Sequence, residues 1–402
     1  MSIPKMRFYG YDSSWKVSKL GELFEIYSGN TPSRSDRNNY DNGTIPWIKT
    51  TDLNNSLIYV NEEKITDQGA KKLKTLPKNT ILIAMYGGFN QIGRTGLLTY
   101  PATINQALAS LLPVKEINSY FLLNYLNLRK DSWRNVAASS RKDPNITKND
   151  VEKFKISFPS IEEQSSIGSL FRTFDDLLAS YKENLANYQS LKATMLSKMF
   201  PKAGQTIPEI RLDGFEGEWE IKKFKSISNK RGKSNSKGYD YPVYSVSNQN
   251  GLIPQSEQFE GSRLENLEKT SYKIVEPNEF AYNPARINVG SIAFNNLDET
   301  VIVSSLYVIF SLDKSINNNY ALLFIKSPEF NKEVRRNTEG SVREYLFYEN
   351  FANIRIPIPP SLEEQQAIGS YFSNLDNLIA ALQEKISQLE TLKKKLLKDM
   401  FI

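Results

Sequence analysis

Apolar residues recur at alternating steps of four and three along two long stretches of the chain. The seam positions are Phe174, Leu178, Tyr181, Leu185 and Tyr188 in the first stretch, and Leu375, Ile379, Leu382, Ile386 and Leu389 in the second. This spacing is typical of a coiled coil, and a lysine interrupts both seams at the same register, Lys192 and Lys393. We therefore predict two long helices that pair as an antiparallel coiled coil. The alternative is that each helix packs only on its own globular domain.

Each predicted helix has a recognisable start. The alternating runs FKISF (154–158) and IRIPI (354–358) predict short strands that end at a proline. Ser160 then precedes Glu163 by three residues, as Ser361 precedes Glu364. This spacing predicts a capping box, in which the serine oxygen accepts the glutamate amide and the glutamate reaches back to the serine amide.

The two helices are copies of one sequence. Residues 159–200 recur without a gap as residues 360–401, and residues 3–19 recur as residues 207–223. The intervening segments show no alignment with each other. We interpret the chain as two related frames that carry two divergent inserts, with globular domains at 1–157 and 201–358 and helical segments at 158–200 and 359–402.

The repeated segments SIEEQSSIGSLF (160–171) and SLEEQQAIGSYF (361–372), called the EEQ segments below, allow two interpretations. They carry extra apolar residues, Ile167 and Phe171 in the first copy and Ile368 and Phe372 in the second. These residues either tuck a first helical turn onto the domain or form a docking surface that is repeated for a repeated partner.

The inserts combine strand-like runs with polar loops. Residues 80–86 and 96–100 read as strands, and the segments 28–40, 87–96, 228–239, 244–251 and 282–291 read as loops rich in Asn, Ser, Gly and Arg. We expect a mixed β framework that presents these loops.

Composition narrows the possible functions. A chain of 402 residues exceeds what one hydrophobic core supports, so two or more domains are expected. The absence of cysteine and histidine removes disulfides, thiolate metal sites and the commonest general base. The sequence shows no apolar leader and no run of about 18 apolar residues, so we expect a cytoplasmic protein without a membrane span. The net charge of +6 mildly favours a polyanionic partner.

The loop residues suit duplex DNA. Arginine, asparagine and glutamine can bond bidentately to base edges, whereas lysine and serine suit phosphate. The predicted DNA-binding residues are Asn30, Ser33, Arg34, Arg37, Lys49, Asn90, Gln91, Arg94, Arg141, Lys142, Lys230, Arg231, Lys233, Asn248, Asn250, Asn283, Arg286, Asn288 and Arg343. For each single residue, ordinary solvation of a loop is the competing interpretation.

Catalytic motifs are missing. Residues 88–95 have the spacing of a phosphate-binding Walker A loop, but Arg94 stands where lysine is required. No paired carboxylates at catalytic spacing and no nucleophile elbow occur. We therefore predict no catalytic residue, no metal ligand and no cofactor in this chain.

Both halves of the chain carry specific motifs. They are GNTPSR (29–34), IPWIKTTDL (45–53), ITDQGAKKL (65–73), IGRTG (92–96), TINQALA (103–109), YNPARINVGSI (282–292) and SSLYVIF (304–310), together with the strand-proline-EEQ-helix junction in both halves. With these motifs, essentially the whole chain resembles one family, the specificity subunits of type I restriction-modification systems. One departure is the segment SSRKDPNI (139–146), which lacks the glycine found in EGSVR (339–343). That departure leaves the geometry of the first loop open.

The resemblance implies a mixed α+β fold with two target-recognition domains in pseudo-twofold symmetry, separated by the antiparallel helix pair. It implies that each domain reads one half of a bipartite, asymmetric double-stranded DNA target in a bacterium or archaeon. The helices would set the spacer and dock two methyltransferase subunits, with two restriction subunits outside them. S-adenosylmethionine, ATP and magnesium would then belong to those partners.

Two rival functions stay open on sequence alone. The first is a specificity module of another multisubunit or fused methyltransferase-nuclease system. The second is a coiled-coil scaffold that binds proteins and has no role on DNA. An enzyme that acts alone ranks last, because no catalytic motif was found.

Overall fold

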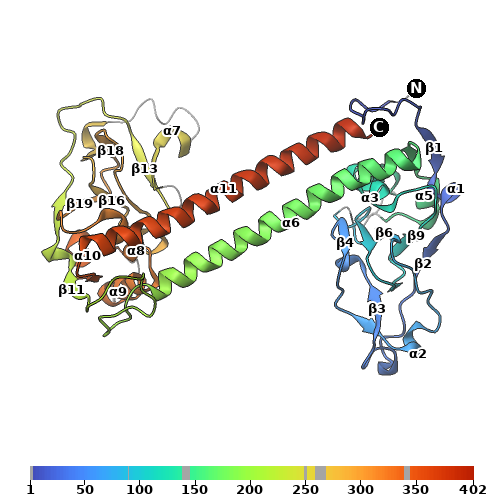
Figure 1. The fold of residues 1–402 in the computed structure, drawn as a ribbon, viewed down its shortest axis with the longest axis horizontal. Helices are drawn as coiled ribbons and strands as arrows, with labels where there is room; N and C mark the ends of the chain where they lie inside the picture. Colours follow the sequence, from blue (N-terminus) through green and yellow to red (C-terminus); the bar gives the residue numbers. More distant parts are fainter. Residues whose placement is uncertain (1–2, 89, 138–144, 249–250, 259–268, 339–344) are drawn as a thin grey trace. The chain divides into compact units, whose positions relative to one another are not determined.

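The structure is a computed structural model that describes residues 3–402 except 89, 138–144, 249–250, 259–268 and 339–344. The chain divides into two compact units (Figure 1). The first unit comprises Met1–Lys182 and Glu384–Ile402, and the second comprises Glu183–Gln383. No helix in the described part of the chain is long and apolar enough to cross a membrane.

The first unit is built on a five-stranded sheet in the order β2-β9-β6-β7-β4, beside a three-stranded sheet β5-β3-β8 and the antiparallel pair β1-β10. Its strands are β1 Lys16–Lys19, β2 Ile26–Ser28, β3 Ile45–Ile48, β4 Ser56–Ile58, β5 Lys64–Ile65, β6 Ile81–Ala84, β7 Thr95–Leu98, β8 Thr103–Ile104, β9 Leu108–Leu111 and β10 Lys155–Phe158. Its short helices are α1 Leu20–Leu23, α2 Asp67–Ala70, α3 Ser119–Leu128, α4 Ser132–Val136 and α5 Lys148–Lys153.

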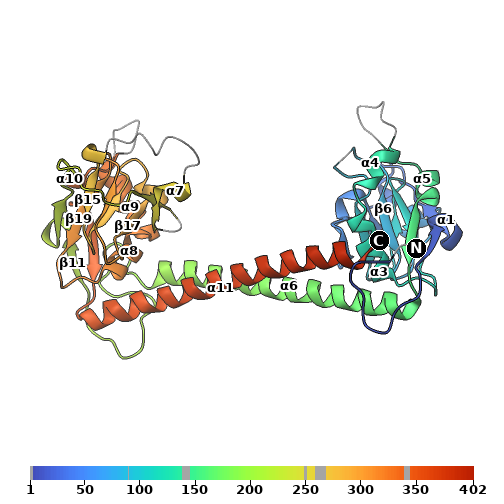
Figure 2. The same cartoon turned by 90° about the horizontal axis from the view of Figure 1, so that it is seen from above.

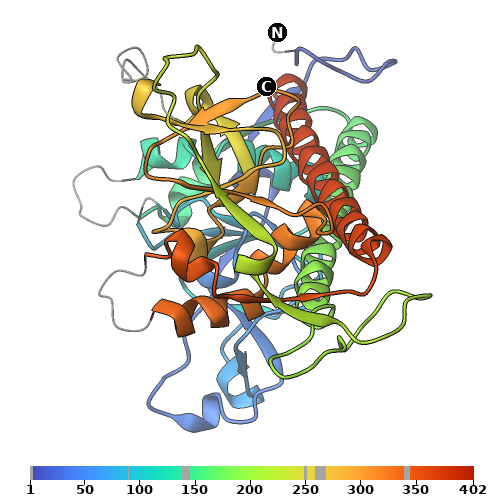
Figure 3. The same cartoon turned by 90° about the vertical axis from the view of Figure 1, so that its left-hand side faces the viewer.

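The second unit is built on a four-stranded sheet in the order β12-β19-β16-β17, with the pairs β13-β14, β15-β18 and β11-β20 beside it. Its strands are β11 Glu220–Lys223, β12 Ser228–Arg231, β13 Tyr244–Ser247, β14 Gly251–Pro254, β15 Lys273–Val275, β16 Phe280–Tyr282, β17 Ile292–Phe294, β18 Val301–Val303, β19 Val308–Leu312 and β20 Arg355–Ile358. Its short helices are α7 Gln255–Gln258, α8 Asn318–Ile325, α9 Pro328–Thr338 and α10 Tyr348–Phe351. Figure 3 gives another view of the strands and short helices of this unit.

Four strands of each central sheet share one topology, although the sequences of the two inserts do not align. The sheet of the first unit has a fifth strand, β4, which pairs in parallel with β7. In the first unit β9 lies between β2 and β6, and β6 pairs with β7, all antiparallel. In the second unit β19 lies between β12 and β16, and β16 pairs with β17, again antiparallel. The strands β12 and β13 fall in segments for which the sequence predicted loops, and that prediction is wrong there because Ser228 and Ser245 are buried strand residues.

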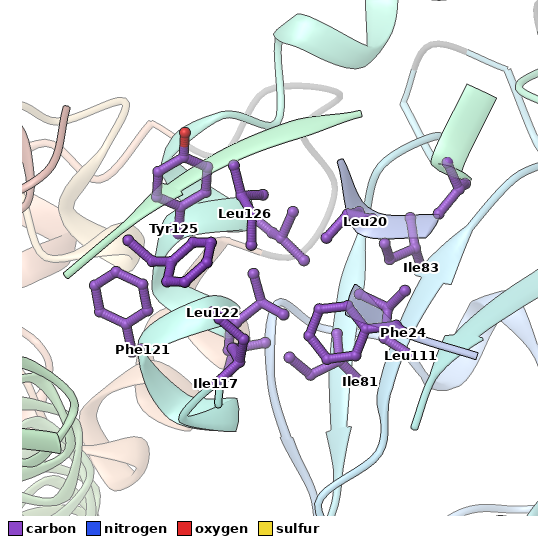
Figure 4. Close-up of a cluster of buried hydrophobic side chains, with 14 of the residues drawn as sticks. Leu20, Phe24, Ile81, Ile83, Leu111, Ile117, Phe121, Leu122, Tyr125 and Leu126 are labelled. Atoms are coloured by element: carbon purple, nitrogen blue, oxygen red, sulfur yellow. The ribbon is translucent and has the colours of Figure 1, made fainter. Parts of the chain in front are cut away.

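A layer of aromatic and aliphatic side chains joins each sheet to its core helix. Figure 4 shows Phe121, Leu122 and Leu126 of α3 in one buried cluster with Ile81 and Ile83 of β6. Helix α3 is apolar nearly all round, since every residue from Tyr120 to Leu126 is buried. Helix α8 occupies the corresponding place in the second unit, where Tyr320 and Phe324 are fully buried.

The two long helices are α6 Ile161–Lys198 and α11 Leu362–Met400. Along the seam Phe174, Leu178, Leu375 and Ile386 are buried, and the other predicted seam residues are half-buried. In the first unit Lys393 pairs with Asp175, and Lys182 pairs with Glu390 at 2.6 Å. The partner number on α11 falls as the number on α6 rises, so the helices run antiparallel, as predicted.

The lysine interruptions of the seam have matching partners. Lys192 pairs with Asp376 in the second unit just as Lys393 pairs with Asp175 in the first. The end of α11 also packs in the core of the first unit, where Phe401 stacks on Phe121 at 5.1 Å between ring centroids. The alternative that each helix packs only on its own domain is therefore wrong. Figure 2 shows both helices from above.

Only half of the predicted capping box forms at each helix start. Ser160 accepts the amide of Glu163 at 3.4 Å, and Ser361 accepts the amide of Glu364 at 3.1 Å. The glutamates do not reach back, because both oxygens of Glu163 accept from the guanidinium of Arg7 at 2.7 Å. Arg211 binds Glu364 in the same way at 2.7 and 2.8 Å. Each glutamate thus ties the preceding chain segment to the helix.

The glutamine that follows each of these glutamates forms hydrogen bonds through its side chain with main-chain groups of the divergent insert. Gln164 accepts the amide of Asn118 at 2.9 Å and donates to the carbonyl of Glu116 at 3.1 Å. Gln365 repeats both bonds in the second unit, at 2.9 and 3.2 Å, with the equivalent main-chain groups, the amide of Asn317 and the carbonyl of Ser315. Asn118 and Asn317 in turn cap α3 and α8.

The burial of their apolar residues decides between the two interpretations of the repeated EEQ segments. Ile167, Phe171, Ile368 and Phe372 are each at most 2% exposed and belong to the cores of their own units. A partner cannot dock on side chains that are already buried. For these residues the prediction of a docking surface is wrong, and the segment serves internal packing.

Candidate nucleic-acid interface

Two equivalent connections carry the predicted base-reading residues. The β6–β7 connection spans residues 85–94 and contains Asn90, Gln91 and Arg94, and the β16–β17 connection spans residues 283–291 and contains Asn283, Arg286 and Asn288. Both are closed by a main-chain bond, from Ala84 to Arg94 at 2.8 Å and from Asn283 to Ser291 at 3.1 Å. The common sheet topology therefore brings the two sets to the same place in each unit.

The start of each connection is hydrogen-bonded to the chain segment just before α5 in the first unit and just before α10 in the second. The amide of Ile146 donates to the carbonyl of Met85 at 2.9 Å, and the amide of Leu346 donates to the carbonyl of Pro284 at 3.0 Å. Both donors are fully buried. These bonds show that Met85 and Pro284, and likewise Ile146 and Leu346, occupy equivalent positions.

In the first connection the backbone is shaped by a glycine. Gly93 has φ +71°, and a Cβ there would lie 2.2 Å from Cδ1 of the buried Trp133. Asn90 is exposed and Gln91 is half-buried. Arg94 is half-buried and donates to the carbonyl of Leu53 at 3.4 Å. The IGRTG motif is thus explained first by packing, and Asn90, two residues before it, is the most accessible of the three predicted contacts in this connection.

Replacing Gly93 with alanine should lower the free energy of unfolding of the first unit by about 3 kcal/mol, because a left-handed backbone and a steric clash are combined. Denaturant unfolding followed by tryptophan fluorescence measures the change. Gly10→Ala is the matched control, since Gly10 has φ +90° with open space around it. Equal losses for the two variants would contradict the role of Trp133.

In the second connection one candidate is structural and two are accessible. The side-chain oxygen of Asn283 accepts the amide of Ala285 at 3.0 Å, which shapes the turn. Arg286 and Asn288 are exposed. The connection ends on Gly290 with φ +89°, and a Cβ at that glycine would be 3.9 Å from the carbonyl oxygen of Asn248. The predicted residue Asn248, which is exposed, therefore lies beside the connection.

A second group of candidates in the first unit lines a cleft of about 330 Å³. Asn30 and Ser33 form one side, and the exposed Lys71 and Lys72 follow on from α2 at the other. The two lysines were not predicted as DNA contacts. Their signal in the sequence is the pair of adjacent lysines in the ITDQGAKKL motif.

Two predicted cations in the first unit are engaged with the protein itself. Arg34 and Lys49 both pair with Glu63. The hydrogen bond from Arg34, assisted by Lys49, holds the pKa of Glu63 below its usual value. The Arg34 guanidinium also lies 4.5 Å from the ring centroid of Tyr40. Arg37, in contrast, is exposed on the 3-10 turn Arg37–Asn39.

The cations of β12 show the same division. Lys230 pairs with Glu349 at 2.6 Å, and Arg231 donates to Ser311 at 3.1 Å. Lys233, two residues further on, is exposed. Ion pairs at an exposed surface contribute little to stability and can be exchanged for phosphate contacts. Arg141, Lys142, Asn250 and Arg343 lie outside the described residues.

Comparisons with known proteins identify the same family in both halves of the chain. A family model described as the type I restriction modification DNA specificity domain matches residues 12–188 and again residues 216–391. The type I restriction enzyme EcoR124I/EcoR124II specificity subunit of Escherichia coli is 30% identical over 175 residues, which cover 42% of this chain and 43% of that protein. The MjaIX specificity subunit of Methanocaldococcus jannaschii is 24% identical over 415 residues, which cover 94% and 90%.

Two solved structures share the fold. The S subunit of a type I restriction-modification system from M. genitalium has a TM-score of 0.61 at 16% identity and covers 100% of this chain and 99% of its own. A chain from a study of complex assembly in the type I R-M system has a TM-score of 0.53 at 16% identity, with coverage of 98% and 99%. At these identities the likeness establishes the fold alone.

Proposed function

The chain belongs to the type I restriction-modification DNA specificity family, and from that premise we propose that each recognition domain reads one half of a bipartite, asymmetric DNA target. As a specificity subunit it is the non-catalytic member of its complex. The proposal concerns the details of how it reads DNA, how it holds the two half-sites apart and which partners it binds.

One observation carries the proposal. The two units present equivalent connections, β6–β7 and β16–β17, on four strands of the same topology, yet the side chains on the connections differ. A common geometry with different polar side chains suits two domains that approach two different half-sites in the same way. Exposed Asn90 in the first connection and exposed Arg286 in the second supply base-edge donors.

The helices α6 and α11 would set the spacer between the half-sites. Each helix has one buried aromatic residue in its first turns and another just past its last residue, Phe171 and Phe200 for α6 and Phe372 and Phe401 for α11. With both ends fixed, the number of residues between the anchors determines the length at 1.5 Å per residue. The spacer would then follow from the length of the helices.

The same helices would dock two methyltransferase subunits, with two restriction subunits outside them. Equivalent leucines on the two copies, Leu177 and Leu378, are 43% and 47% exposed. A repeated exposed apolar residue on a repeated helix suits two copies of one partner. S-adenosylmethionine, ATP and magnesium would be bound by those partners.

Arg286→Ala should weaken binding of the assembled complex to its target by about 1–3 kcal/mol and relax one base position in the second half-site. Asn90→Ala is expected to do the same in the first half-site. Binding to targets with each position varied in turn measures both effects. Lys222→Ala, a charge on the separate strand β11, is the control. Unchanged affinity and an unchanged recognition motif in both variants would refute the assignment of these connections.

The rival functions differ in simple observations. A specificity module of another fused system would require no separate methyltransferase and motor subunits for activity. A protein scaffold would co-purify with partners but show no salt-dependent DNA binding. Linear dependence of the logarithm of affinity on the logarithm of salt concentration would favour the DNA-reading function.

A further inference from the structure

Two aromatic rings are exposed at the base of the second connection. Tyr345 and Phe347 are 40% and 53% exposed, and their rings stack in parallel with centroids 5.8 Å apart and an interplanar angle of 9°. Among the phenylalanines of the described residues, Phe347 alone is exposed. A phenylalanine has no polar atom that water could satisfy, so this exposure is unfavourable for the folded subunit.

The backbone that carries these rings is fixed. Leu346, between them, is fully buried, and its amide donates to the carbonyl of Pro284 at 3.0 Å. Its own carbonyl accepts from the buried hydroxyl of Tyr282 at 3.0 Å. Pro284 lies two residues before Arg286. The backbone between the two rings is therefore anchored to the connection that we propose reads the second half-site.

Phe347 also occupies a position where the fold would favour another residue. It is the N-cap of α10 and makes no capping bond. The equivalent residue of the first unit, Thr147, caps α5 by accepting the amide of Asp150 at 3.2 Å. Serine, threonine, asparagine and aspartate stabilise a helix at the N-cap, and phenylalanine does not. Phe347 is thus unfavourable both as an exposed apolar side chain and as an N-cap residue. A residue that goes against local preferences in this way is typical of a functional position.

The first unit does not share this feature, because Asn145 and Thr147 stand in place of the two aromatics. A feature needed by a duplicated partner would be expected in both units. A feature confined to one unit and placed beside its reading connection suits the asymmetric target instead.

We propose that Tyr345 and Phe347 form an aromatic contact with DNA, directed at the apolar surfaces of bases in the half-site read by the second domain. The inference rests on the proposed function and names the base surface that this domain would contact. Two sources of apolar base surface fit, the methyl group of thymine in the major groove and the face of a base at an opened step.

The decisive variant is Phe347→Thr in the complex assembled with its methyltransferase subunits. We expect about a tenfold loss of affinity for the target, the usual effect of removing one aromatic contact with a base. We also expect an unfolding temperature equal to or above that of the parent, because threonine can cap α10. A contact that only stabilised the fold would lower the unfolding temperature instead. Phe347→Tyr should retain the affinity.

Controls separate this inference from its premise. Thr147→Ala removes the cap of α5 and should lower stability without changing affinity for the second half-site. If Arg286→Ala weakens binding while Phe347→Thr does not, the inference fails and the proposed function stands. If neither variant changes binding, the proposed function fails as well. Loss of methyltransferase binding by Phe347→Thr, with DNA binding of the free subunit intact, would also overturn the inference in favour of a protein contact.

Modified DNA distinguishes the two sources. Uracil in place of each thymine of the half-site should reduce the affinity of the parent but not of Phe347→Thr if the methyl group is contacted. A rise in 2-aminopurine fluorescence with the parent alone would indicate an opened step. Either result supports the contact with bases, and the absence of both differences would rule it out.

Discussion

Arg211→Ala should lower the free energy of unfolding of the second unit by about 3–5 kcal/mol, since the variant leaves a buried carboxylate without its partner. Glu364 is 2% exposed in its side chain and accepts both of its close bonds from Arg211. The same guanidinium donates to the carbonyls of Glu216 and Gly217 at 2.8 and 2.7 Å, so the segment before β11 would also be released. Hydrogen exchange around α8 and β20 would locate the loss.

The matched variant is Arg7→Ala, which breaks the equivalent pair with Glu163 in the first unit. It should destabilise that unit by a similar amount and leave the second unit unchanged. Replacing both partners with methionine should restore much of the stability, because no buried charge then remains. If Arg211→Ala changed stability by less than about 1 kcal/mol, the pair would have no more effect than a surface ion pair.

Lengthening both long helices by one heptad should lengthen the spacer of the DNA target by about three base pairs. Seven residues add roughly 10.5 Å of helix, and each base pair of duplex spans about 3.4 Å. Equivalent insertion points after Asn184 and Lys385 are exposed and lie between the buried anchors of each helix. Mapping the methylated positions in cells that carry the variant and its partner subunits gives the new spacer directly.

Insertion in α6 alone is the control, because unequal helices cannot keep both Lys192 with Asp376 and Lys393 with Asp175. That variant should lose stability and DNA modification together. A correctly folded double-insertion variant that still modifies the original spacer would show that the helices do not set the distance.

The repeated frame could be predicted well because its signals are local. The seam spacing, the serine caps and the strands before each proline all depend on neighbours within a few residues. The partner of Glu163 could not be predicted in this way, since Arg7 is distant in sequence and a Ser-x-x-Glu pattern fits a capping box equally well. A long-range ion pair replaced the reciprocal bond.

The common topology of the inserts was hidden for a different reason. A strand needs only suitable alternation and burial, so Leu82 and Ala281 can occupy equivalent places without any shared identity. For the candidate site, residue type indicated exposed Arg286 and Lys233 but also selected Arg34 and Lys49, which bind Glu63. Sequence composition does not show which cations a nearby carboxylate has already engaged.

The hydrogen bonds of Gln164 and Gln365 with the inserts bear on how such genes change. Both glutamines contact the insert through peptide groups of the chain before α3 or α8, and every sequence supplies peptide groups. A different insert with a capped helix at this point would form the same hydrogen bonds with these glutamines. Recombination between the repeated gene segments would therefore exchange one insert in a single step and leave the repeated frame, with its glutamine contacts, unchanged.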